Sequence, residues 1–314
     1  MRRLVREGYF VRVLDPNASC QCPGELNGQV EMIRGTVCDR TLLKRCCEGA
    51  KVLFHFASST LPAESNRDPI KDAASNLIDN LGVLTAAANS GVERVIFPSS
   101  GGTVYGIPAV LPISEACSTD PISSYGIVKL TTEKYMMLFE RQYSMRCIAL
   151  RYGNPYGDGQ YASIGFGVIP AFFHAAAMNR PLEVWGDGSV VRDFIYIEDA
   201  VEATLRVLHY GGPIRIFNIG SGVGTSINEI VRAIQMVTGL RIQVAYREGR
   251  HSDVPQIILD IARAKQELGW SPRTSLNEGI ARAWKWWLQE VESPLCQEPL
   301  AAVSSFAMEG HEEV

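Results

Sequence analysis

The chain has 314 residues, 46% of them hydrophobic, and its 30 basic and 34 acidic side chains give a formal net charge of -4. This length and composition suffice for a sizeable buried core in one large domain or two smaller ones. The slightly acidic balance argues against nucleic acid or an anionic membrane as the principal partner and favours a small molecule. No apolar run reaches the roughly 18 residues of a spanning helix, and residues 1–8 lack the apolar core of a signal peptide, so we expect a cytoplasmic protein.

Eight cysteines raise the question of a metal site or of disulfides. Cys20 lies two residues before Cys22, and Cys46 adjoins Cys47, but neither pair has a second pair at metal-ligand spacing. The others are scattered along the chain: Cys38, Cys117, Cys147 and Cys296. We therefore predict reduced thiols and no bound metal.

The first half of the chain alternates short apolar runs with longer amphipathic segments. The predicted strands are residues 10–14, 30–33, 52–56, 95–97 and 147–150. Helices are predicted near 69–90, with Gly91 at the position of a left-handed helix end, and near 123–143. Such alternation is typical of an α/β fold with a doubly wound parallel sheet.

The pattern changes after about residue 157, where glycine and proline become denser and short apolar runs alternate with turns. We expect a smaller α/β lobe that faces the substrate. Residues 214–220 are predicted to form one more strand that returns to the main sheet, and residues 276–291 a Trp-rich helix that closes the lobe by core packing. The predicted domains are 1–157 with about 190–222, then about 158–189 with 223–292, followed by a loose tail at 293–314.

Tyr125 and Lys129 form the strongest local chemical pattern, because residues four apart share one face of a helix. A nearby ammonium favours phenolate, and we expect it to lower the pKa of Tyr125 so that the oxygen can accept a proton. Ser100 and Thr103 follow a predicted strand about 25 residues earlier, where a hydroxyl could bond a substrate oxygen. A chance Tyr–Lys pair and a polar glycine turn are the ordinary structural alternatives.

Several segments in the same order resemble the extended short-chain dehydrogenase/reductase family, most of all its UDP-glucose 4-epimerases. The similarity covers roughly residues 4–292. The matching segments are Val13–Asp15, Gly35–Asp39, His55–Ala57, Asn76, Ser99–Gly106, Tyr125–Lys129, Leu150–Gly157 and Val191–Asp199. The resemblance implies a Rossmann-like NAD-binding domain made of the first predicted domain, and a sugar-nucleotide-binding lobe made of the second.

The resemblance also implies which residues contact NAD. They are Asp15, Asp39, Ala57, Ser58, Asn76, Tyr125, Lys129 and Tyr152. Asp15 would accept from the adenosine ribose hydroxyls, which favours NAD over its 2'-phosphorylated relative because like charges repel. Asp39 would meet the adenine, and Lys129 would also hold the nicotinamide ribose. Each of these residues, taken singly, has an ordinary loop explanation.

For the sugar nucleotide, the resemblance points to Asn154 near the diphosphate and to Asp253 near the ribose. Arg192 and Arg250 would clamp the phosphates, since the planar guanidinium gives directed, charge-assisted bonds to phosphate oxygens. Ile257 would lie near the sugar, and its size leaves acetamido and plain sugars both possible.

The implied mechanism is reversible oxidation at C4 of the sugar. Tyr125 would remove the proton of the 4-hydroxyl, with Lys129 and Ser100 or Thr103 assisting. NAD would take hydride from C4 and return it to the other face of the turned keto sugar.

The chain departs from the family at its beginning. The family opens with a strand and a glycine-rich turn that approaches the pyrophosphate at a helix N-terminus. Here this element is absent, and residues 1–8 resemble the end of the helix that follows it. Either translation begins further upstream or the chain is truncated. We expect exposed sheet edges, and weak NAD binding or poor folding.

A second departure concerns the turn with the catalytic hydroxyl, which is one residue longer than usual. Alignment on the strand assigns the hydroxyl to Ser100, whereas alignment on residues 104–106 places Gly101 there. We assign Ser100, with Thr103 as the substitute. Gly101 and Gly102 stand near the place of the acidic pair of 4,6-dehydratases, which favours an epimerase.

The predicted function is NAD-dependent epimerisation of a UDP-hexose or a uronic acid relative by a homodimer that associates through the helices near 69–90 and 123–143. The alternatives are a sugar-nucleotide reductase, decarboxylase or dehydratase on the same scaffold. A catalytically silent sugar-nucleotide-binding subunit is also possible, because the missing glycine turn favours it while the intact Tyr125 and Lys129 oppose it.

Overall fold

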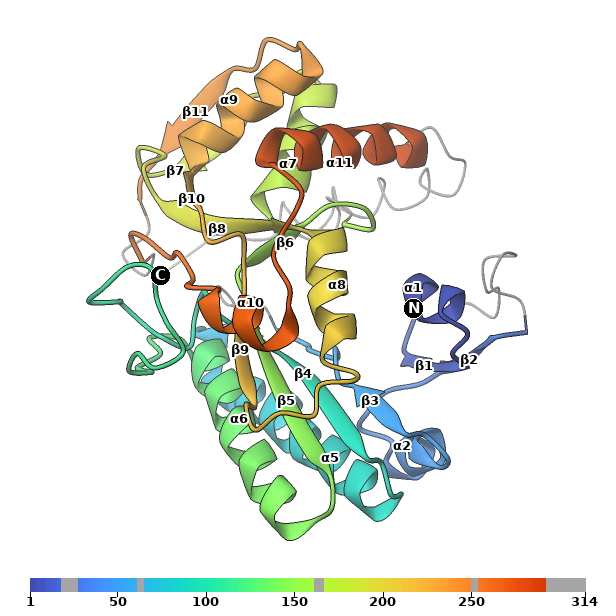
Figure 1. Cartoon of the computed structure of the whole chain (residues 1–314). Helices are drawn as coiled ribbons and strands as arrows, with labels where there is room; N and C mark the ends of the chain where they lie inside the picture. Colours follow the sequence, from blue (N-terminus) through green and yellow to red (C-terminus); the bar gives the residue numbers. More distant parts are fainter. Residues whose placement is uncertain (18–27, 61–64, 161–166, 250–253, 292–314) are drawn as a thin grey trace. The chain divides into compact units, whose positions relative to one another are not determined.

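The computed structural model describes residues 1–17, 28–60, 65–160, 167–249 and 254–291, and the predicted tail lies outside them. Two compact units account for the chain (Figure 1). Unit 1 comprises residues 1–106, 119–151 and 211–217, and unit 2 comprises 107–118, 152–210 and 218–314. These units divide the chain at other points than the predicted domains, since residues 152–157 and most of 190–222 belong with unit 2.

The strands of unit 1 lie in two separate sheets. The first pairs β1 (Val11–Asp15) with β2 (Val30–Arg34) in parallel. The second has the order β3-β4-β5-β9, with β3 at Val52–Phe54, β4 at Arg94–Ser100, β5 at Arg146–Tyr152 and β9 at Ile216–Ile219. All six predicted strands are therefore present, and β9 joins the main sheet as expected. The strand predicted to reach residue 56 ends at Phe54.

Each of the two sheets keeps an unpaired edge. Among the described strands, β1 pairs only with β2, and β3 pairs only with β4. A strand edge without a partner presents free N–H and C=O groups.

Helices occur before and between the strands of unit 1. They are α1 (Arg2–Arg6), α2 (Arg40–Cys47), α4 (Pro69–Asp72), the π-helix η2 (Ala73–Ile78), α5 (Asp79–Asn89) and α6 (Ser124–Gln142). Figure 1 shows α5 and α6 beside β4 and β5. The helix predicted near 69–90 is present as a continuous helical segment, and its middle takes the π-helical form. Gly91, with a φ of 72°, ends it as predicted.

A hydrophobic core joins these layers, because strands buried on a face are apolar and helices contribute one stripe each. Its members come from α2, α5, β4, α6 and β5. They include Leu43, Val83, Leu84, Val95, Phe97, Met136, Cys147 and Ala149. The thiols of Cys47 and Cys147 are buried here, and burial raises the pKa of both, to about 11 for Cys47 and about 12 for Cys147.

Unit 2 is built around short strands. One sheet has the order β10-β8-β6, from Gly224–Ser226, Val191–Tyr196 and Asn154–Tyr156, and a second pairs β7 (Leu182–Trp185) with β11 (Val244–Arg247) in parallel. Its helices are α7 (Val168–Ala177), α8 (Ile197–Arg206), α9 (Ile227–Thr238), α10 (Ala262–Leu268) and α11 (Leu276–Val291).

The Trp-rich helix α11 closes the core of unit 2, as predicted. Trp287 is buried, and its ring stacks on Trp284 with centroids 5.2 Å apart. Phe173 of α7 meets Trp284 edge-on at 5.2 Å. None of the helices within the described ranges is both long and apolar enough to cross a membrane.

Candidate active site

The predicted catalytic turn follows β4 directly. The backbone carbonyl of Ser100 accepts hydrogen bonds from the N–H groups of Thr103 and Val104, at 3.4 and 3.2 Å. Thr103 turns its hydroxyl oxygen into the protein, where it has no hydrogen-bond partner among the described residues. Ser100 is half-buried at the carboxyl end of the strand. This favours Ser100 over Thr103 as the hydroxyl that a ligand at the sheet edge would meet.

Helix α6 begins against this turn because of a glycine. Ser123 caps the helix by accepting the N–H of Gly126 at 3.2 Å. A Cβ at Gly126 would lie 2.8 Å from the carbonyl oxygen of Thr103 and 2.9 Å from Cβ of Pro121. Only a residue without a side chain lets the first turn of α6 come this close, which brings Tyr125 beside the end of β4.

Lys129 lies one turn beyond Tyr125 on the same face of α6, as predicted. The ammonium donates to the carbonyl of Pro98 at 2.9 Å and lies 4.6 Å from the ring centroid of Phe97. Its distance to the ring centroid of Tyr125 is 5.4 Å. Burial lowers the pKa of Lys129 to about 8, although the carboxylate of Asp72 acts in the opposite direction.

The expected lowering of the pKa of Tyr125 is wrong for this arrangement. Burial, and then the nearby Asp72 carboxylate, raise it to about 12. Lys129 is itself buried, so its charged form is disfavoured where it would otherwise stabilise phenolate. Burial and the Asp72 carboxylate therefore favour the neutral phenol over phenolate at Tyr125.

Asn76 connects the loop after β3 to helix η2. Its side-chain oxygen accepts the N–H of Ser59 at 2.9 Å. Its side-chain nitrogen donates to the hydroxyl of Thr60 at 2.9 Å and to Asp72 at 2.8 Å. The sequence predicted Asn76 for this site but missed Asp72 and Thr60. The spacing of Asp72, four residues before Asn76 on one helix face, was the available signal.

The predicted adenine-side residues lie at the ends of β1 and β2. Asp15 ends β1, is exposed, and accepts the N–H of Asn17 at 2.7 Å. Asp39 caps α2 by accepting the N–H of Leu42 at 2.9 Å. Asp39 thus has a structural role in addition to the predicted contact with adenine, which stays a prediction.

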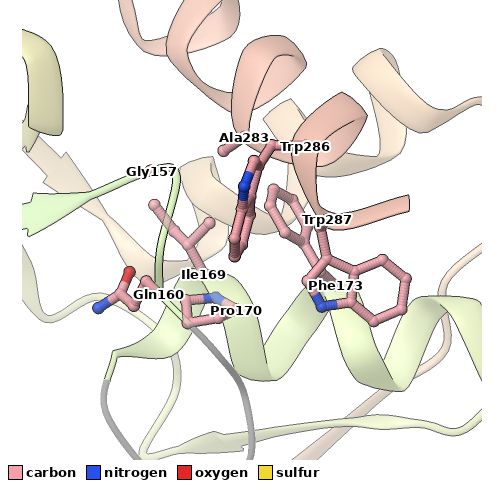
Figure 2. Close-up of a pocket in the computed structure, with 8 residues that line it drawn as sticks. All are labelled: Gly157, Gln160, Ile169, Pro170, Phe173, Ala283, Trp286 and Trp287. Atoms are coloured by element: carbon pink, nitrogen blue, oxygen red, sulfur yellow. The ribbon is translucent and has the colours of Figure 1, made fainter. Parts of the chain in front are cut away.

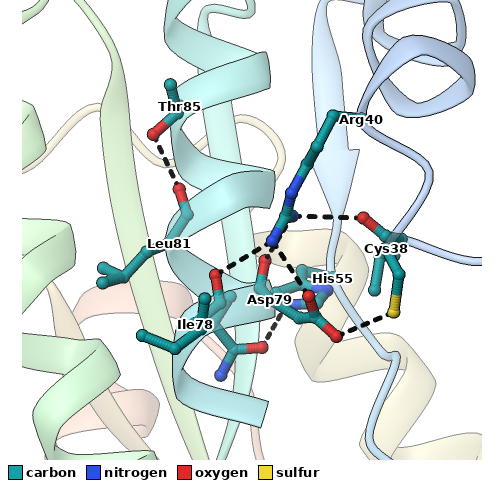
Figure 3. Close-up of polar contacts among 9 residues, drawn as sticks. Cys38, Arg40, His55, Ile78, Asp79, Leu81 and Thr85 are labelled. Atoms are coloured by element: carbon teal, nitrogen blue, oxygen red, sulfur yellow. Dashed lines mark hydrogen bonds and ion pairs between the residues drawn. The ribbon is translucent and has the colours of Figure 1, made fainter. Parts of the chain in front are cut away.

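Arg40 connects the loop between β2 and α2 to α5. Arg40 donates to the Asp79 carboxylate at 2.9 Å and to the carbonyl of Ile78 at 3.3 Å, and the thiol of Cys38 donates to the same carboxylate at 3.0 Å (Figure 3). Gly82 leaves room for the guanidinium, because a Cβ there would lie 1.6 Å from it. No pattern in the sequence indicated this contact between Arg40 and Asp79.

The remaining predicted residues belong to unit 2. Tyr152 is buried, and its hydroxyl lies 2.5 Å from that of Thr204, which leaves its predicted contact with NAD a prediction. Asn154 starts β6, and the guanidinium of Arg192 donates to the carbonyls of Val191 and Val254 at 2.9 and 2.7 Å. Arg250 and Asp253 lie outside the described residues. Ile257 is fully buried.

Unit 2 also contains a small cavity at the contact of α7 with α11, which Figure 2 shows. It is lined by Gly157, Gln160, Ile169, Pro170, Phe173, Ala283, Trp286 and Trp287. The lining is mostly apolar, with the amide of Gln160 and the indoles of Trp286 and Trp287, and includes none of the predicted site residues. The described residues of the chain contain no group of three or more His, Cys, Asp or Glu placed to hold a metal ion.

Comparison with known proteins matches residues 1–220 to the model of the NAD dependent epimerase/dehydratase family. The chain belongs to this family. It is 33% identical to a putative UDP-glucose 4-epimerase of Methanocaldococcus jannaschii over 285 residues, 90% of this chain and 92% of that protein. It is 36% identical to the dTDP-4-dehydro-6-deoxyglucose reductase of Escherichia coli over 235 residues, 75% of this chain and 74% of that protein.

Among solved structures, the chain is similar to the UDP-glucose 4-epimerase of Thermotoga maritima with UDP-glucose. The identity is 34% and the TM-score 0.86, over 93% of this chain and 94% of that one. This likeness confirms the Rossmann-like α/β fold. The family resemblance drawn from the sequence motifs is likewise confirmed.

The side chains of this epimerase/dehydratase family member suit the ribose ends of NAD. Asp15 offers an exposed carboxylate as an acceptor, and Ala57 and Ser58 are exposed after β3. Lys129 donates one of its three N–H groups to the Pro98 carbonyl, and ribose hydroxyls are suitable acceptors for the others.

Proposed function

We propose that the chain is an NAD-dependent 4-epimerase of a UDP-hexose. The observation that carries the proposal is the convergence of the Tyr125 phenol and the Lys129 ammonium, 5.4 Å from ammonium to ring centroid, beside the hydroxyl-bearing end of β4. Such a group can take and return a proton at a sugar hydroxyl. The family, and the UDP-glucose 4-epimerases among the relatives, support hydride chemistry at this position.

In this mechanism Tyr125 accepts the proton of the sugar 4-hydroxyl and later gives it back, while Ser100 donates a hydrogen bond to the same oxygen. The ammonium of Lys129 binds the nicotinamide ribose and stabilises the phenolate as it forms. When bound, NAD supplies hydride acceptance and return. Since the pKa of Tyr125 is raised to about 12, proton removal depends on Lys129 being charged when the substrate is in place.

Other residues of the chain hold the two ligands. We assign Asp15, Asp39, Ala57, Ser58, Asn76 and Tyr152 to NAD, and Asn154, Arg192, Arg250 and Asp253 to the sugar nucleotide. Arg192 is the best supported of the second group, because its guanidinium is already fixed by two backbone carbonyls, and a fixed guanidinium binds phosphate at a lower cost in entropy.

We further propose that two copies associate through α4, η2 and α6. These elements contact each other, and their outer faces carry the exposed apolar side chains Ile70, Ile78, Ile127 and Leu138. Exposed apolar side chains on elements that contact one another support an interface between copies at this face. Ile127→Asp should shift the protein to a monomer in light scattering after size exclusion. Met236→Asp, at an exposed position of α9, serves as the control and should not.

The test of the activity is conversion of UDP-galactose to UDP-glucose by the purified chain with added NAD. We expect turnover, and a loss of about 100- to 10,000-fold in kcat for Tyr125→Phe, the range for a general acid–base group. Tyr143→Phe, at the exposed end of the same helix, should retain activity. Absence of turnover by a folded chain that binds NAD would contradict the epimerase proposal.

A sugar-nucleotide reductase is the second candidate, because the chain is 36% identical to a dTDP-4-dehydro-6-deoxyglucose reductase. The two reactions differ in their redox balance. A reductase consumes NADH in proportion to product, whereas an epimerase changes neither the amount of NAD nor the amount of NADH over the whole reaction. Oxidation of added NADH in the presence of a 4-keto sugar nucleotide would favour the reductase.

A further inference from the structure

Asp72 is a fully buried carboxylate held by neutral hydrogen-bond donors. One oxygen accepts from Asn76 at 2.8 Å and from the hydroxyl of Thr60, and the other accepts from the hydroxyl of Ser124 at 2.6 Å. Within the described ranges, no Lys, Arg or His lies within ion-pair distance of it. A buried carboxylate is costly unless it is well bonded, so a residue retained in this form calls for an explanation.

The partners of Asp72 come from three separate segments. Thr60 lies in the loop after β3, Asn76 lies on η2, and Ser124 is the first residue of α6. Tyr125 follows Ser124 directly. A single side chain therefore ties the loop proposed to line the NAD site to the helix start that carries the proposed base.

A second set of contacts connects the start of α6 to the residues before α4. Together with the contacts of Asp72, these contacts form what we call the joint between α4 and α6. The N–H of Tyr125 donates to the hydroxyl of Ser65 at 3.1 Å, and the N–H of Ser124 donates to the side chain of Asn66 at 2.8 Å. The first turn of α6 is thus held on its α4 side by polar contacts and on its β4 side by the close approach at Gly126. Among these groups Asp72 alone is charged.

We propose that Asp72 is a positioning residue for the reaction, which fixes the phenol of Tyr125 relative to the loop of residues 57–60. The inference rests on the proposed function, since it assigns Tyr125 the role of proton acceptor and donor. The charge of Asp72 adds a second effect, because it raises the pKa of both Tyr125 and Lys129.

The charged and titratable groups around this joint are few in the described structure. Asp72 faces it from α4 and Lys129 from α6 itself, and His55, which follows β3, interacts electrostatically with Lys129 and with Asp79 of α5. Burial lowers the pKa of His55 to about 4, so it is neutral near pH 7. Asp72 is then the negative charge that opposes phenolate at Tyr125 and favours the ammonium at Lys129.

Substitution of Asp72 by asparagine can separate the effect of its hydrogen bonds from the effect of its charge. In Asp72→Asn the amide oxygen can still accept from Thr60 and Asn76, while the amide nitrogen donates to Ser124, whose hydroxyl rotates to accept. Asp72→Ala removes both the bonds and the charge. Asp68→Asn is the matched control, because Asp68 caps the same helix by accepting the N–H of Lys71, and asparagine caps equally well.

The experiment measures kcat, KM and the pH profile of UDP-galactose conversion for the full chain and these variants. A second readout is the ultraviolet titration of tyrosinate, taken as the difference between each variant and the same variant carrying Tyr125→Phe. We expect Asp72→Ala to lower kcat about 100-fold with KM changed far less, as for a misplaced catalytic group. Asp72→Asn should keep much more activity, and its profile and its tyrosinate titration should move to lower pH.

The role is overturned if both Asp72 variants lose only stability, with kcat, pH profile and tyrosinate titration equal to those of Asp68→Asn. If the unsubstituted chain has no turnover, the proposed function fails. The tyrosinate titration then still decides whether Asp72 controls Tyr125: a shift in Asp72→Asn supports the joint, and its absence overturns it.

Discussion

The buried ion pair beneath the candidate active site provides a stability test. The side chains of Glu133 on α6 and Arg151 on β5 are only 1% and 3% exposed. The carboxylate accepts two hydrogen bonds from Arg151, at 3.0 and 2.6 Å, and one from Ser99 at 2.5 Å. The guanidinium also lies 4.8 Å from the ring centroid of Tyr105. The pair joins the helix that carries Tyr125 and Lys129 to β5, and the Ser99 hydrogen bond joins the same carboxylate to β4, the strand that ends at Ser100.

Glu133→Gln keeps the size of the side chain but leaves the Arg151 charge buried without a carboxylate. Breaking a buried pair in this way costs about 3–5 kcal/mol in the free energy of unfolding. The Lys51–Glu93 pair of the same unit is the control, since its side chains are 75% and 63% exposed. Glu93→Gln should cost at most about 1 kcal/mol.

Urea unfolding is followed by circular dichroism for both variants. If the dependence of the free energy of unfolding on urea concentration is the same in both, the difference in their midpoints reports the difference in stability. Replacing both Glu133 and Arg151 by methionine should recover much of the loss, because no unpaired charge remains. The reasoning is refuted if Glu133→Gln is no more destabilising than Glu93→Gln. It is also refuted if the double substitution is as unstable as the single one.

Two further predictions concern His55 and Gly126. The pKa of His55 is lowered from 6.5 to about 4 in the folded chain, so its contribution to stability is full above pH 6.5 and is lost as the pH falls to 4. In His55→Gln, the free energy of unfolding should therefore fall by about 3 kcal/mol less over this pH range, as measured by urea unfolding at a series of pH values. An equal slope in both proteins would contradict the burial of a neutral imidazole. Gly126→Ala should lower kcat by about 100-fold, because its Cβ would lie 2.8 Å from the Thr103 carbonyl, whereas Gly211→Ala, with open space around it, should not. Unchanged turnover in Gly126→Ala would show that the contact of α6 with the turn is dispensable.

Local sequence patterns were enough to predict most of the helices and strands of unit 1 and the pair of Tyr125 and Lys129. Strong period and composition signals located the strands of both sheets of unit 1, the helix at 276–291 and the left-handed end at Gly91. These signals are local, because each depends on residues within one or two turns. The adjacency of Tyr125 and Lys129 is local for the same reason, since both residues lie on one helix.

The surroundings of this pair, in contrast, depend on contacts between distant segments of the chain. Asp72 meets Ser124 across 52 positions of sequence, and Glu133 meets Arg151 from a different element. No sequence pattern predicted the π-helical turn within residues 69–90 either. The shift of the Tyr125 pKa in the direction opposite to the sequence expectation follows from the same cause: burial depends on every segment that packs around a group, whereas spacing along one helix reports only its nearest neighbours.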